Sequence, residues 1–364
     1  MFLKSVVAVL KKPKLIIQLD KKKVLIFFFK SFIIFNFYIV NFLIDSLLIA
    51  LFPASKFFNK KKKILFIGNL YANQNKDCLS PDYYGPFLSL KKEKKDFDYY
   101  FISYNFFYKF KIFIKIYLNQ YNKIILSSNN PKNPIYITIR QLKIIKKIYK
   151  IELVNILWDT ASKKILENKK DIYICHKNII NDFPNFKKKL GYNKNNTIFK
   201  LVPYDFSNII KTSKDKNIDF IFIGQTSDYR DYRKKFLNFL KKKTNIFILD
   251  KNRDKFIPDK DYFDFISRSK ITVNFSMSVD YHQIKARVLE AIYFETLVIE
   301  DERSPVLKYF KPDHEIVTYK TKEDIVKKVN YFLKNEKKRL QIVTNAKKKY
   351  SNKFTSKYYW SGIL

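Results

Sequence analysis

Two short apolar segments, Ile64–Gly68 and Ile218–Gly224, end in a glycine, a point at which a following helix N-terminus could offer N–H donors to a phosphate. Neither segment is followed by the G-x-G-x-x-G sequence of dinucleotide-binding proteins, and the 364 residues include no Walker A sequence and only five glycines. A phosphate site in this chain would therefore depend on helix N-termini and basic side chains. The lack of both sequences argues against a dehydrogenase and against a P-loop nucleotide hydrolase.

The residue types that hold metals are scattered. Cys78 and Cys175 are isolated, and no group of His and Cys has the spacing of a zinc site. A D-x-D sequence, Asp259-Lys260-Asp261, follows a proline and is expected to begin a helix instead of ending a strand. We interpret these two acids as helix caps, so no metal site is predicted.

Downstream of Lys63, short apolar runs alternate with helical stretches, and the pattern restarts at Ile218. Strands are predicted at 64–68, 98–103, 123–127, 152–157, 171–175 and 197–203, and again at 218–224, 245–249, 271–275, 297–300 and 315–319. Helices are predicted at 81–95, 104–119, 134–149, 160–169 and 177–190, and again at 229–243, 259–268, 282–294, 304–310 and 321–335. This alternation is typical of parallel sheets covered by helices on both faces.

The chain is therefore expected to have an α/β fold with two Rossmann-like domains whose parallel sheets face each other across a cleft. We place the first domain at 60–206, the second at 215–345, and at 346–364 a C-terminal helix that packs back toward the first domain. In such sheets the ligand lies beyond the carboxyl ends of the strands.

The chain is strongly basic, with 72 Lys and Arg against 33 Asp and Glu and a formal net charge of +39. Only eight of the cations are arginines, the residue best suited to bidentate phosphate contacts. Lys, Ile, Asn, Phe and Tyr, whose codons are rich in A and T, are all enriched. We therefore attribute the positive charge to the base composition of the gene, with the additional lysines on solvated surfaces. Such a field attracts polyanions without specificity, and no specific nucleic-acid partner is expected.

Residues 1–58 form a basic and hydrophobic segment. Positions 24–52 carry only two charges, Lys30 and Asp45, and are long enough to cross a bilayer as a helix. Asp45 would be costly near the bilayer centre, and lysines flank both ends, which disfavours a single span. We favour a helix lying on the cytoplasmic, inner face of the membrane, with a true span and a helix buried against the globular body as alternatives.

The segment 269–319 contains SKITVNFS, the stretch HQIKARVLEAIYFETLVIEDE and the start of a strand–helix unit. These sequences resemble the C-terminal donor domain of GT-B glycosyltransferases, most closely the group 1, CgeB-like transferases of the spore-maturation type. The resemblance covers about residues 218–355, and it includes the R-x-x-E helix of the family as Arg287-Val-Leu-Glu290. The first half of the chain resembles the family only in architecture.

The resemblance implies roles for individual residues of the second domain. Glu290 matches the glutamate that accepts hydrogen bonds from the ribose hydroxyls of the donor nucleotide, and a carboxylate can present two acceptors to a vicinal diol. Lys285 and Arg287 are similar to the cations that bind the diphosphate, where they would offset the charge that develops on the leaving nucleotide.

Two further positions match the family less closely. Gly224-Gln225 followed by Arg230 has the spacing of the paired phosphate contacts in the first loop, with glutamine in the place of the first cation. His282 lies eight residues before Glu290, where retaining enzymes often carry a glutamate, and it could contact the donor sugar or diphosphate. Both retention and inversion therefore stay open.

In the first domain, Asp159 follows a predicted strand and would face the cleft. It is our candidate general base for the acceptor hydroxyl if the reaction inverts, and its alternative role is an N-cap. Asp82, Tyr83 and Tyr84 could line the acceptor pocket.

The function implied is transfer of a sugar from a nucleotide-diphosphate donor to a hydroxyl of a glycan, a lipid-linked glycan or a surface polymer, without a metal or other cofactor. One alternative is a non-catalytic, membrane-docked polyanion-binding protein. The other is a metal-dependent GT-A-type transferase that would use Asp259 and Asp261.

Overall fold

The computed structural model describes 63–72, 76–94, 96–102, 108–129, 136–160, 170–186, 196–207, 210, 215–226, 231–250, 257–277 and 280–364, together with residues 39 and 43. The expectations for the segment 1–58 thus lie outside the described residues except at these two positions. The helix expected over 160–169 also lies outside them, apart from residue 160. Within the described part of the chain, no helix has the length and apolar character needed to cross a membrane.

The first domain is built on a six-stranded parallel sheet with the order β2-β1-β3-β4-β5-β6. Its strands are β1 (Ile64–Gly68), β2 (Asp98–Phe101), β3 (Lys123–Ser127), β4 (Glu152–Leu157), β5 (Lys177–Ile180) and β6 (Thr197–Phe199). Because β1 pairs with β2 on one side and with β3 on the other, the sheet has its switch point between β1 and β3. A ligand is expected at the carboxyl ends of these two strands.

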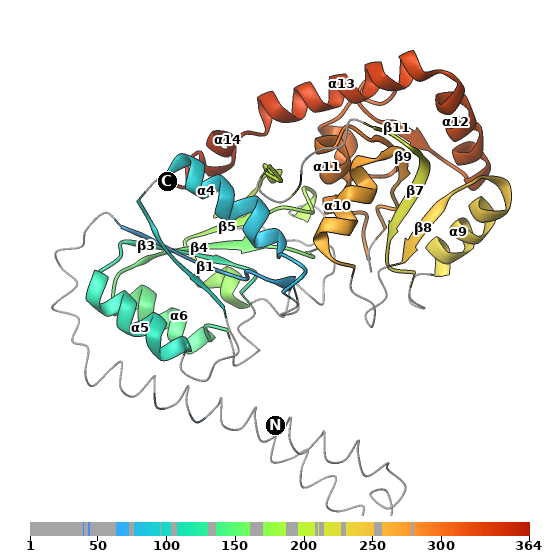
Figure 1. Cartoon of the computed structure of the whole chain (residues 1–364). Coiled ribbons are helices and arrows are strands. Elements are labelled where there is room, and N and C mark those ends of the chain that lie inside the picture. The colour runs from blue at the N-terminus through green and yellow to red at the C-terminus, as the bar shows by residue number, and fades with distance from the viewer. Residues whose placement is uncertain are drawn as a thin grey trace, which may run out of the picture.

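Helices cover both faces of this sheet (Figure 1). On one face, Leu65, Ile67 and Ile124 pack against α5 (Tyr108–Asn119) and α6 (Ile139–Lys147). The opposite face packs against α4 (Leu88–Glu93) and α14 (Ser356–Trp360). Successive strand residues point to opposite faces, so the continuous apolar runs of the strands place side chains in both layers.

The second domain repeats this arrangement on a five-stranded parallel sheet with the order β11-β10-β9-β7-β8. Its strands are β7 (Ile218–Gly224), β8 (Phe247–Asp250), β9 (Ser269–Val273), β10 (Leu297–Asp301) and β11 (Val317–Tyr319). The helices α9 (Asp231–Lys243) and α12 (Lys322–Lys334) cover one face, and α10 (Asp259–Ser267) and α11 (Ala286–Tyr293) cover the other. The prediction of an α/β fold with two Rossmann-like parallel sheets is confirmed.

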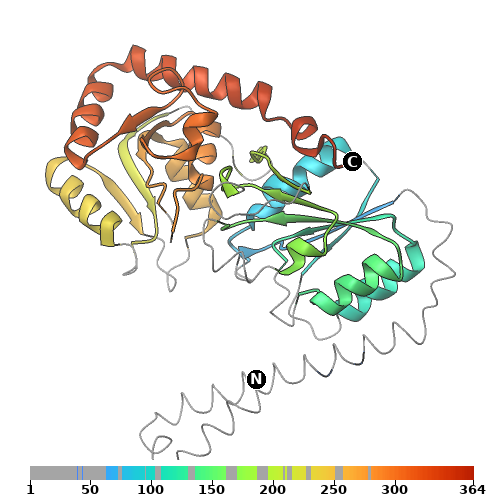
Figure 2. The same ribbon diagram turned by 180° about the vertical axis from the view of Figure 1, so that it is seen from behind.

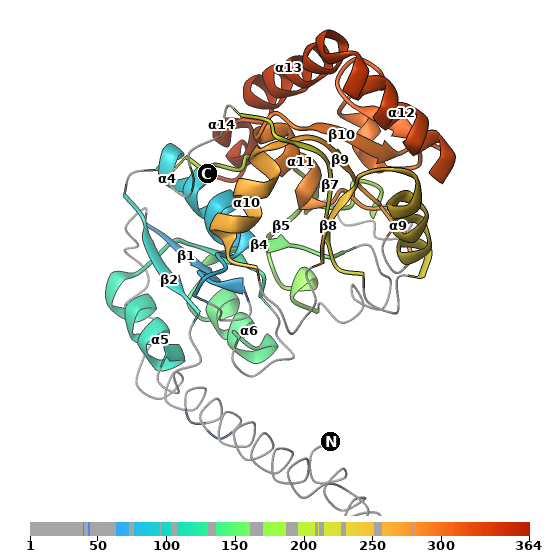
Figure 3. The same ribbon diagram turned by 45° about the vertical axis from the view of Figure 1, so that its right-hand side comes forward.

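The chain returns to the first domain at its C-terminal end. Helix α13 (Glu336–Lys353) packs along α11 and α12, and α14 then lies against α4 (Figures 2 and 3). The Trp360 indole N–H donates a 2.9 Å hydrogen bond to the Ser89 hydroxyl of α4. The Lys200 ammonium donates to the Tyr358 carbonyl at 2.9 Å. These contacts fix the C-terminal segment on the first domain.

An aromatic cluster joins the two domains beneath the cleft. The Phe206 ring, in the segment between the two sheets, lies 5.0 Å from Tyr84 of the first domain and 4.5 Å from Phe263 of α10, measured between ring centroids. Tyr84 also contacts Phe263 edge-on at 5.7 Å. One hydrophobic core therefore continues from one domain into the other.

Two predictions around the fifth strand were wrong. The strand expected at 171–175 is a 3-10 turn, Lys170–Tyr173, and the fifth strand lies at Lys177–Ile180, where a helix was expected. The cause is Asn178, a polar residue that is completely buried in the strand because its amide donates to the Ile172 carbonyl at 3.1 Å. Burial of a hydrogen-bonded asparagine hides the strand from a hydropathy pattern.

Two predicted helices also differ from the structure. The stretch expected as a helix over 304–310 is a single 3-10 turn, Pro305–Lys308. The helix expected over 81–95 includes a π-helical turn, Tyr83–Phe87, around Pro86, before α4 begins. Proline has no N–H for the regular bond, which is consistent with the wider turn at this point.

Candidate active site

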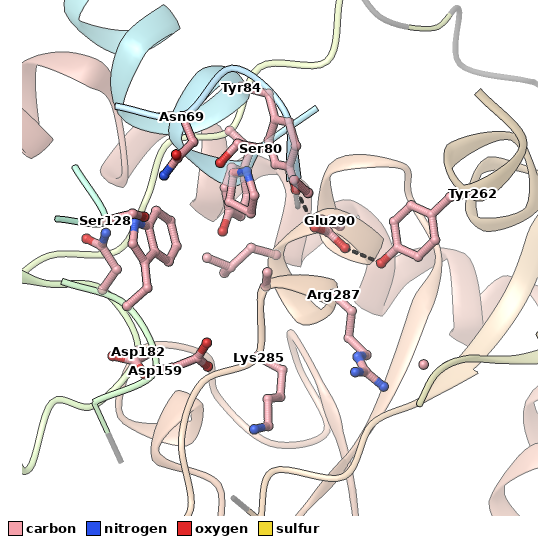
Figure 4. Close-up of a pocket in the computed structure, with 18 of the residues that line it drawn as sticks. Asn69, Ser80, Tyr84, Ser128, Asp159, Asp182, Tyr262, Lys285, Arg287 and Glu290 are labelled. Carbon is pink, nitrogen blue, oxygen red and sulfur yellow. Dashed lines mark hydrogen bonds between the residues drawn. The ribbon is translucent and has the colours of Figure 1, made fainter. Parts of the chain in front are cut away.

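A cleft of about 870 Å³ lies between the two domains. The first domain contributes residues that follow the carboxyl ends of its central strands, among them Asn69, Ser128 and Asp159. The second domain contributes the end of β7 and the first turns of α11 (Figure 4). The cleft therefore lies where the topology of both sheets places a ligand site.

Glu290 lines the cleft from α11 and is only 3% exposed. The Tyr262 hydroxyl of α10 donates to its Oε2 at 2.5 Å, and the Tyr84 hydroxyl of the first domain donates to its Oε1 at 3.5 Å (Figure 4). Burial and the negative charge of Glu290 raise the pKa of both tyrosines well above the usual value. Both phenols therefore stay protonated and act as donors to the carboxylate.

Arg287 lines the same wall and lies directly against the end of β7. A Cβ atom added to Gly224, whose φ is 155°, would lie 2.5 Å from the Arg287 Nη1 atom. The guanidinium also lies over the Phe222 ring, 5.3 Å from its centroid. Glycine at this position therefore permits the close approach of the cation, and the structure brings together two of the predicted site residues.

Lys285 is the N-cap residue of α11, and the first turn of this helix lines the cleft. Gln225 also lines the cleft, and its backbone carbonyl accepts a 2.8 Å hydrogen bond from the Arg233 guanidinium. Arg230 lies outside the described residues. The first turn of a helix and its cationic side chains thus face the space in which a phosphate could bind.

Asp159 lines the opposite wall, beside Asp182 (Figure 4). Its backbone has a φ of 52°, in the left-handed region, and the Gln283 amide of the second domain donates to its Oδ1 at 3.4 Å. The exposed carboxylate of Asp159 is therefore available in the cleft, as a general base would require.

Asp182 was not predicted as a site residue, because the sequence pattern placed it in a helix. It is buried, and its carboxylate accepts two 2.7 Å hydrogen bonds, from the Thr160 backbone N–H and from the Thr160 hydroxyl. Burial and the neighbouring charge of Asp159 raise the pKa of Asp182 to about 6, against the effects of Thr160 and Lys285. A second titratable acid therefore supports the turn that carries Asp159.

His282 does not line the cleft with the other predicted site residues. Its Nδ1 atom lies 2.6 Å from the Ser276 hydroxyl and 3.9 Å from the Asp301 carboxylate, and burial lowers its pKa. Among the described residues, those that line the cleft include its neighbour Gln283 but not His282. A contact of His282 with the donor stays a prediction.

Of the three residues expected around the acceptor pocket, Tyr84 lines the cleft. Asp82 is completely buried behind the cleft wall, where its carboxylate accepts hydrogen bonds from the loops that follow β1, β3 and β4. The side chain has a positioning role that no local sequence pattern indicated.

The D-x-D acids lie in the first turn of a helix, as expected, but they do not cap it: the N-cap residue is Pro258, and no side-chain cap hydrogen bond is formed there. Helix α10 begins at Asp259, whose carboxylate accepts a hydrogen bond from the Leu79 backbone N–H. Within the described ranges, no three His, Cys, Asp or Glu side chains are grouped so that they could hold a metal ion. The arrangement differs from a carboxylate pair at the end of a strand.

Residues 207–364 match a protein-family model described as glycosyl transferase-like. No curated protein sequence matches the chain. Among solved structures, HepE of Anabaena in complex with UDP and glucose has a TM-score of 0.52 and 14% identity over 83% of this chain and 98% of its own.

Two further structures have the same fold. Sucrose-phosphate synthase from Thermosynechococcus elongatus has a TM-score of 0.52 and 9% identity, over 83% of this chain and 96% of its own. An alpha-glucosyltransferase solved with UDP-glucose and DNA containing an abasic site has a TM-score of 0.55 and 11% identity, over 82% of this chain and 98% of its own. Residues 207–364 therefore match a glycosyl transferase-like family, and the chain shares its two-domain fold with these solved structures.

Proposed function

We propose that the protein transfers a sugar from a nucleotide-diphosphate donor to a hydroxyl group of a glycan, a lipid-linked glycan or a surface polymer. The observation that carries this proposal is the placement of Glu290, Arg287 and Lys285 on the first turns of one helix that faces an interdomain cleft. A carboxylate that can accept hydrogen bonds from a ribose diol therefore lies near two cations that can bind a diphosphate, which supports a nucleoside diphosphate as the ligand.

In the proposed donor complex, the ribose hydroxyls donate to the Glu290 carboxylate. Lys285 and Arg287 bind the diphosphate and stabilise the charge on the departing nucleotide. Gly224 and Gln225 border the same space, and Arg230 is proposed to add a further cation. Two of the similar structures were solved with UDP or UDP-glucose, so UDP-glucose is the first donor to test.

On the acceptor side, we assign Asp159 as the general base of an inverting transfer. Its carboxylate is exposed in the cleft, on the wall that the first domain contributes. A retaining transfer would not need this proton acceptor. The anomeric configuration of the product, compared with that of the donor, decides between the two.

Within the GT-B enzymes, we propose a relationship to the group 1, CgeB-like transferases. The support is the R-x-x-E sequence, Arg287 to Glu290, at the start of a helix that follows a parallel strand.

We further propose that the segment 1–58 associates with the inner face of the membrane. Deletion of 1–58 should abolish recovery with anionic vesicles and leave donor binding unchanged, and a full-length protein that does not bind such vesicles would contradict this.

The central experiment is a titration of the full-length protein with UDP-glucose and UDP, followed by thermal unfolding and calorimetry. A nucleotide-sugar enzyme should show a saturable rise in Tm, whereas a polyanion-binding protein should respond to any polyphosphate with steep salt dependence. Glu290→Gln should show this response only at much higher ligand concentrations. The matched control is Glu323→Gln, the same change at an exposed position of α12. Equal binding of UDP by both variants would contradict the proposed donor site.

A further inference from the structure

We infer that the first-domain wall of the cleft is a subsite for a neutral pyranose ring of the acceptor, with the Trp158 indole as its platform. This inference rests on the proposed function and adds the chemical class of the acceptor. Trp158 follows the last residue of β4 and directly precedes Asp159, the candidate base. Its side chain is partly buried and lines the cleft.

The indole is held in one orientation by Asp82. Its N–H donates a 3.0 Å hydrogen bond to Asp82 Oδ1, which also accepts from the hydroxyls of Ser127 at 2.5 Å and Ser128 at 2.8 Å. Asp82 Oδ2 accepts from both the backbone N–H and the side-chain amide of Asn69, each at 3.1 Å. Because the single polar atom of the indole is occupied, the ring presents an apolar surface to the cleft.

Two amide groups near this platform have hydrogen-bonding capacity that the described residues do not use. Asn181 and Gln283 line the cleft from opposite domains and are 3% and 4% exposed. Asn181 Nδ2, a donor, and Gln283 Oε1, an acceptor, have no hydrogen-bond partner among the residues described by the structure. Buried polar atoms are usually paired in native proteins, so these two atoms indicate a polar ligand.

A sugar ring satisfies these features together. Its C–H faces can pack on an aromatic ring, and each hydroxyl both donates and accepts, as the amides of Asn181 and Gln283 require. The carboxylates of Asp159 and Asp182 disfavour a phosphate group beside Trp158, because like charges repel. We therefore commit to an uncharged pyranose.

The chain contains a built-in reporter for this subsite, because it has only two tryptophans. Trp360 is 2% exposed, and its indole N–H is hydrogen-bonded to the Ser89 hydroxyl, away from the cleft. Tryptophan emission is therefore measured for the wild type, for Trp158→Phe and for Trp360→Phe, with UDP present, during titration with methyl hexopyranosides, maltose and cellobiose. Glycerol and glycerol 3-phosphate are the ringless probes.

We expect a saturable change of emission with at least one pyranoside in the wild type and in Trp360→Phe, and none in Trp158→Phe. The ringless probes should have no effect. A response to glycerol 3-phosphate without a response to any pyranoside would overturn the inference. UDP-glucose binding is measured separately on the same three proteins, without UDP. Loss of that binding contradicts the proposed function, whereas intact donor binding without a pyranoside response contradicts the subsite alone.

Kinetics provide the second test. Trp158→Leu removes the aromatic platform and should raise the acceptor KM about tenfold with an unchanged donor dissociation constant. Trp158→Phe keeps an aromatic surface and should have a smaller effect. If Trp158→Leu instead weakens donor binding and leaves the acceptor KM unchanged, the ring serves the donor sugar and the inference is wrong.

Discussion

The Tyr84 hydroxyl of the first domain donates a hydrogen bond to the Glu290 carboxylate of the second domain, with 3.5 Å between the oxygens. The carboxylate that we assign to the donor ribose is therefore also a contact between the domains. Because Tyr262 occupies the other carboxylate oxygen at 2.5 Å, ribose hydroxyls must share or displace these bonds. Donor binding and the contact between the domains are thus expected to be coupled.

Tyr84→Phe tests this coupling. The ring would keep its packing against Phe206 and Phe263, and only the donor to Glu290 would be lost. We expect donor affinity to stay equal or to increase by up to about threefold, and the free energy of unfolding to fall by about 1 kcal/mol. Calorimetry with UDP-glucose and urea unfolding measure the two effects. A large loss of donor affinity would show that the Tyr84 hydroxyl itself contacts the donor.

Glu290→Gln should reduce donor affinity on the order of 10- to 100-fold, because charge-assisted hydrogen bonds to the ribose are lost. The loss should be smaller for a donor that lacks the 2′-hydroxyl, in which one of the two bonds is already missing. The free energy of unfolding of this variant should also fall by about 1–3 kcal/mol, since the new amide would place a donor against a tyrosine hydroxyl that itself donates to Glu290. An unchanged dissociation constant in the folded variant would remove Glu290 from the donor site.

Gly224→Ala should weaken donor binding about tenfold by displacing the Arg287 guanidinium, which a Cβ atom would approach to 2.5 Å. Gly362→Ala is the matched control, because Gly362 also has a positive φ, 71°, but a Cβ atom there meets no other atom within 4 Å. Both variants therefore carry backbone strain, and only the first carries the collision. Equal donor affinities in the two variants would show that the position of Arg287 does not matter.

The fold class and most strands could be predicted because each strand is a short run of apolar residues that is visible in the local sequence. The glycine at the end of β7 and the Arg287-to-Glu290 sequence were both evident within a few residues. Their packing against each other could not be predicted, since Gly224 and Arg287 lie on different elements of the second domain and only the folded sheet brings them together.

The first-domain wall depends on contacts over longer separations. Asp82 and Trp158 are 76 positions apart, and Asp82 reaches Ser127 across 45 positions. Asp182 was hidden for a related reason, because the buried Asn178 made the strand before it appear polar. Buried polar side chains that satisfy one another at long range leave no periodic pattern, and here they build the wall that carries the candidate base.

Transfer activity is expected to survive excess EDTA. In the proposed site Lys285 and Arg287 bind the leaving diphosphate, and the Asp259 carboxylate is already engaged with the Leu79 backbone N–H. Activity is measured with UDP-glucose before and after chelation. Complete loss, restored by Mn²⁺, would support the metal-dependent alternative with Asp259 and Asp261.

The buried carboxyl of Asp182 should make stability depend on pH. Burial, and then the charge of Asp159, raise its folded-state pKa to about 6, whereas the unfolded value is about 3.9. Between these values the folded protein binds the proton more tightly, so the stabilisation is fully present below about pH 4 and is lost as the pH rises through 6.

The Asp182→Asn variant should therefore be most stable relative to the wild type at neutral pH. Asparagine can still accept from the Thr160 N–H and can donate to the Thr160 hydroxyl, so the turn that carries Asp159 is kept. Urea unfolding should show the wild type losing on the order of 2–3 kcal/mol relative to the variant between pH 4 and pH 7.5. Asp159→Asn should shift the midpoint of this loss to lower pH, because it removes the neighbouring charge. A stability difference that stays constant over this range would mean that Asp182 does not titrate there, and a midpoint that Asp159→Asn leaves unchanged would mean that the two carboxyl groups do not interact across the turn.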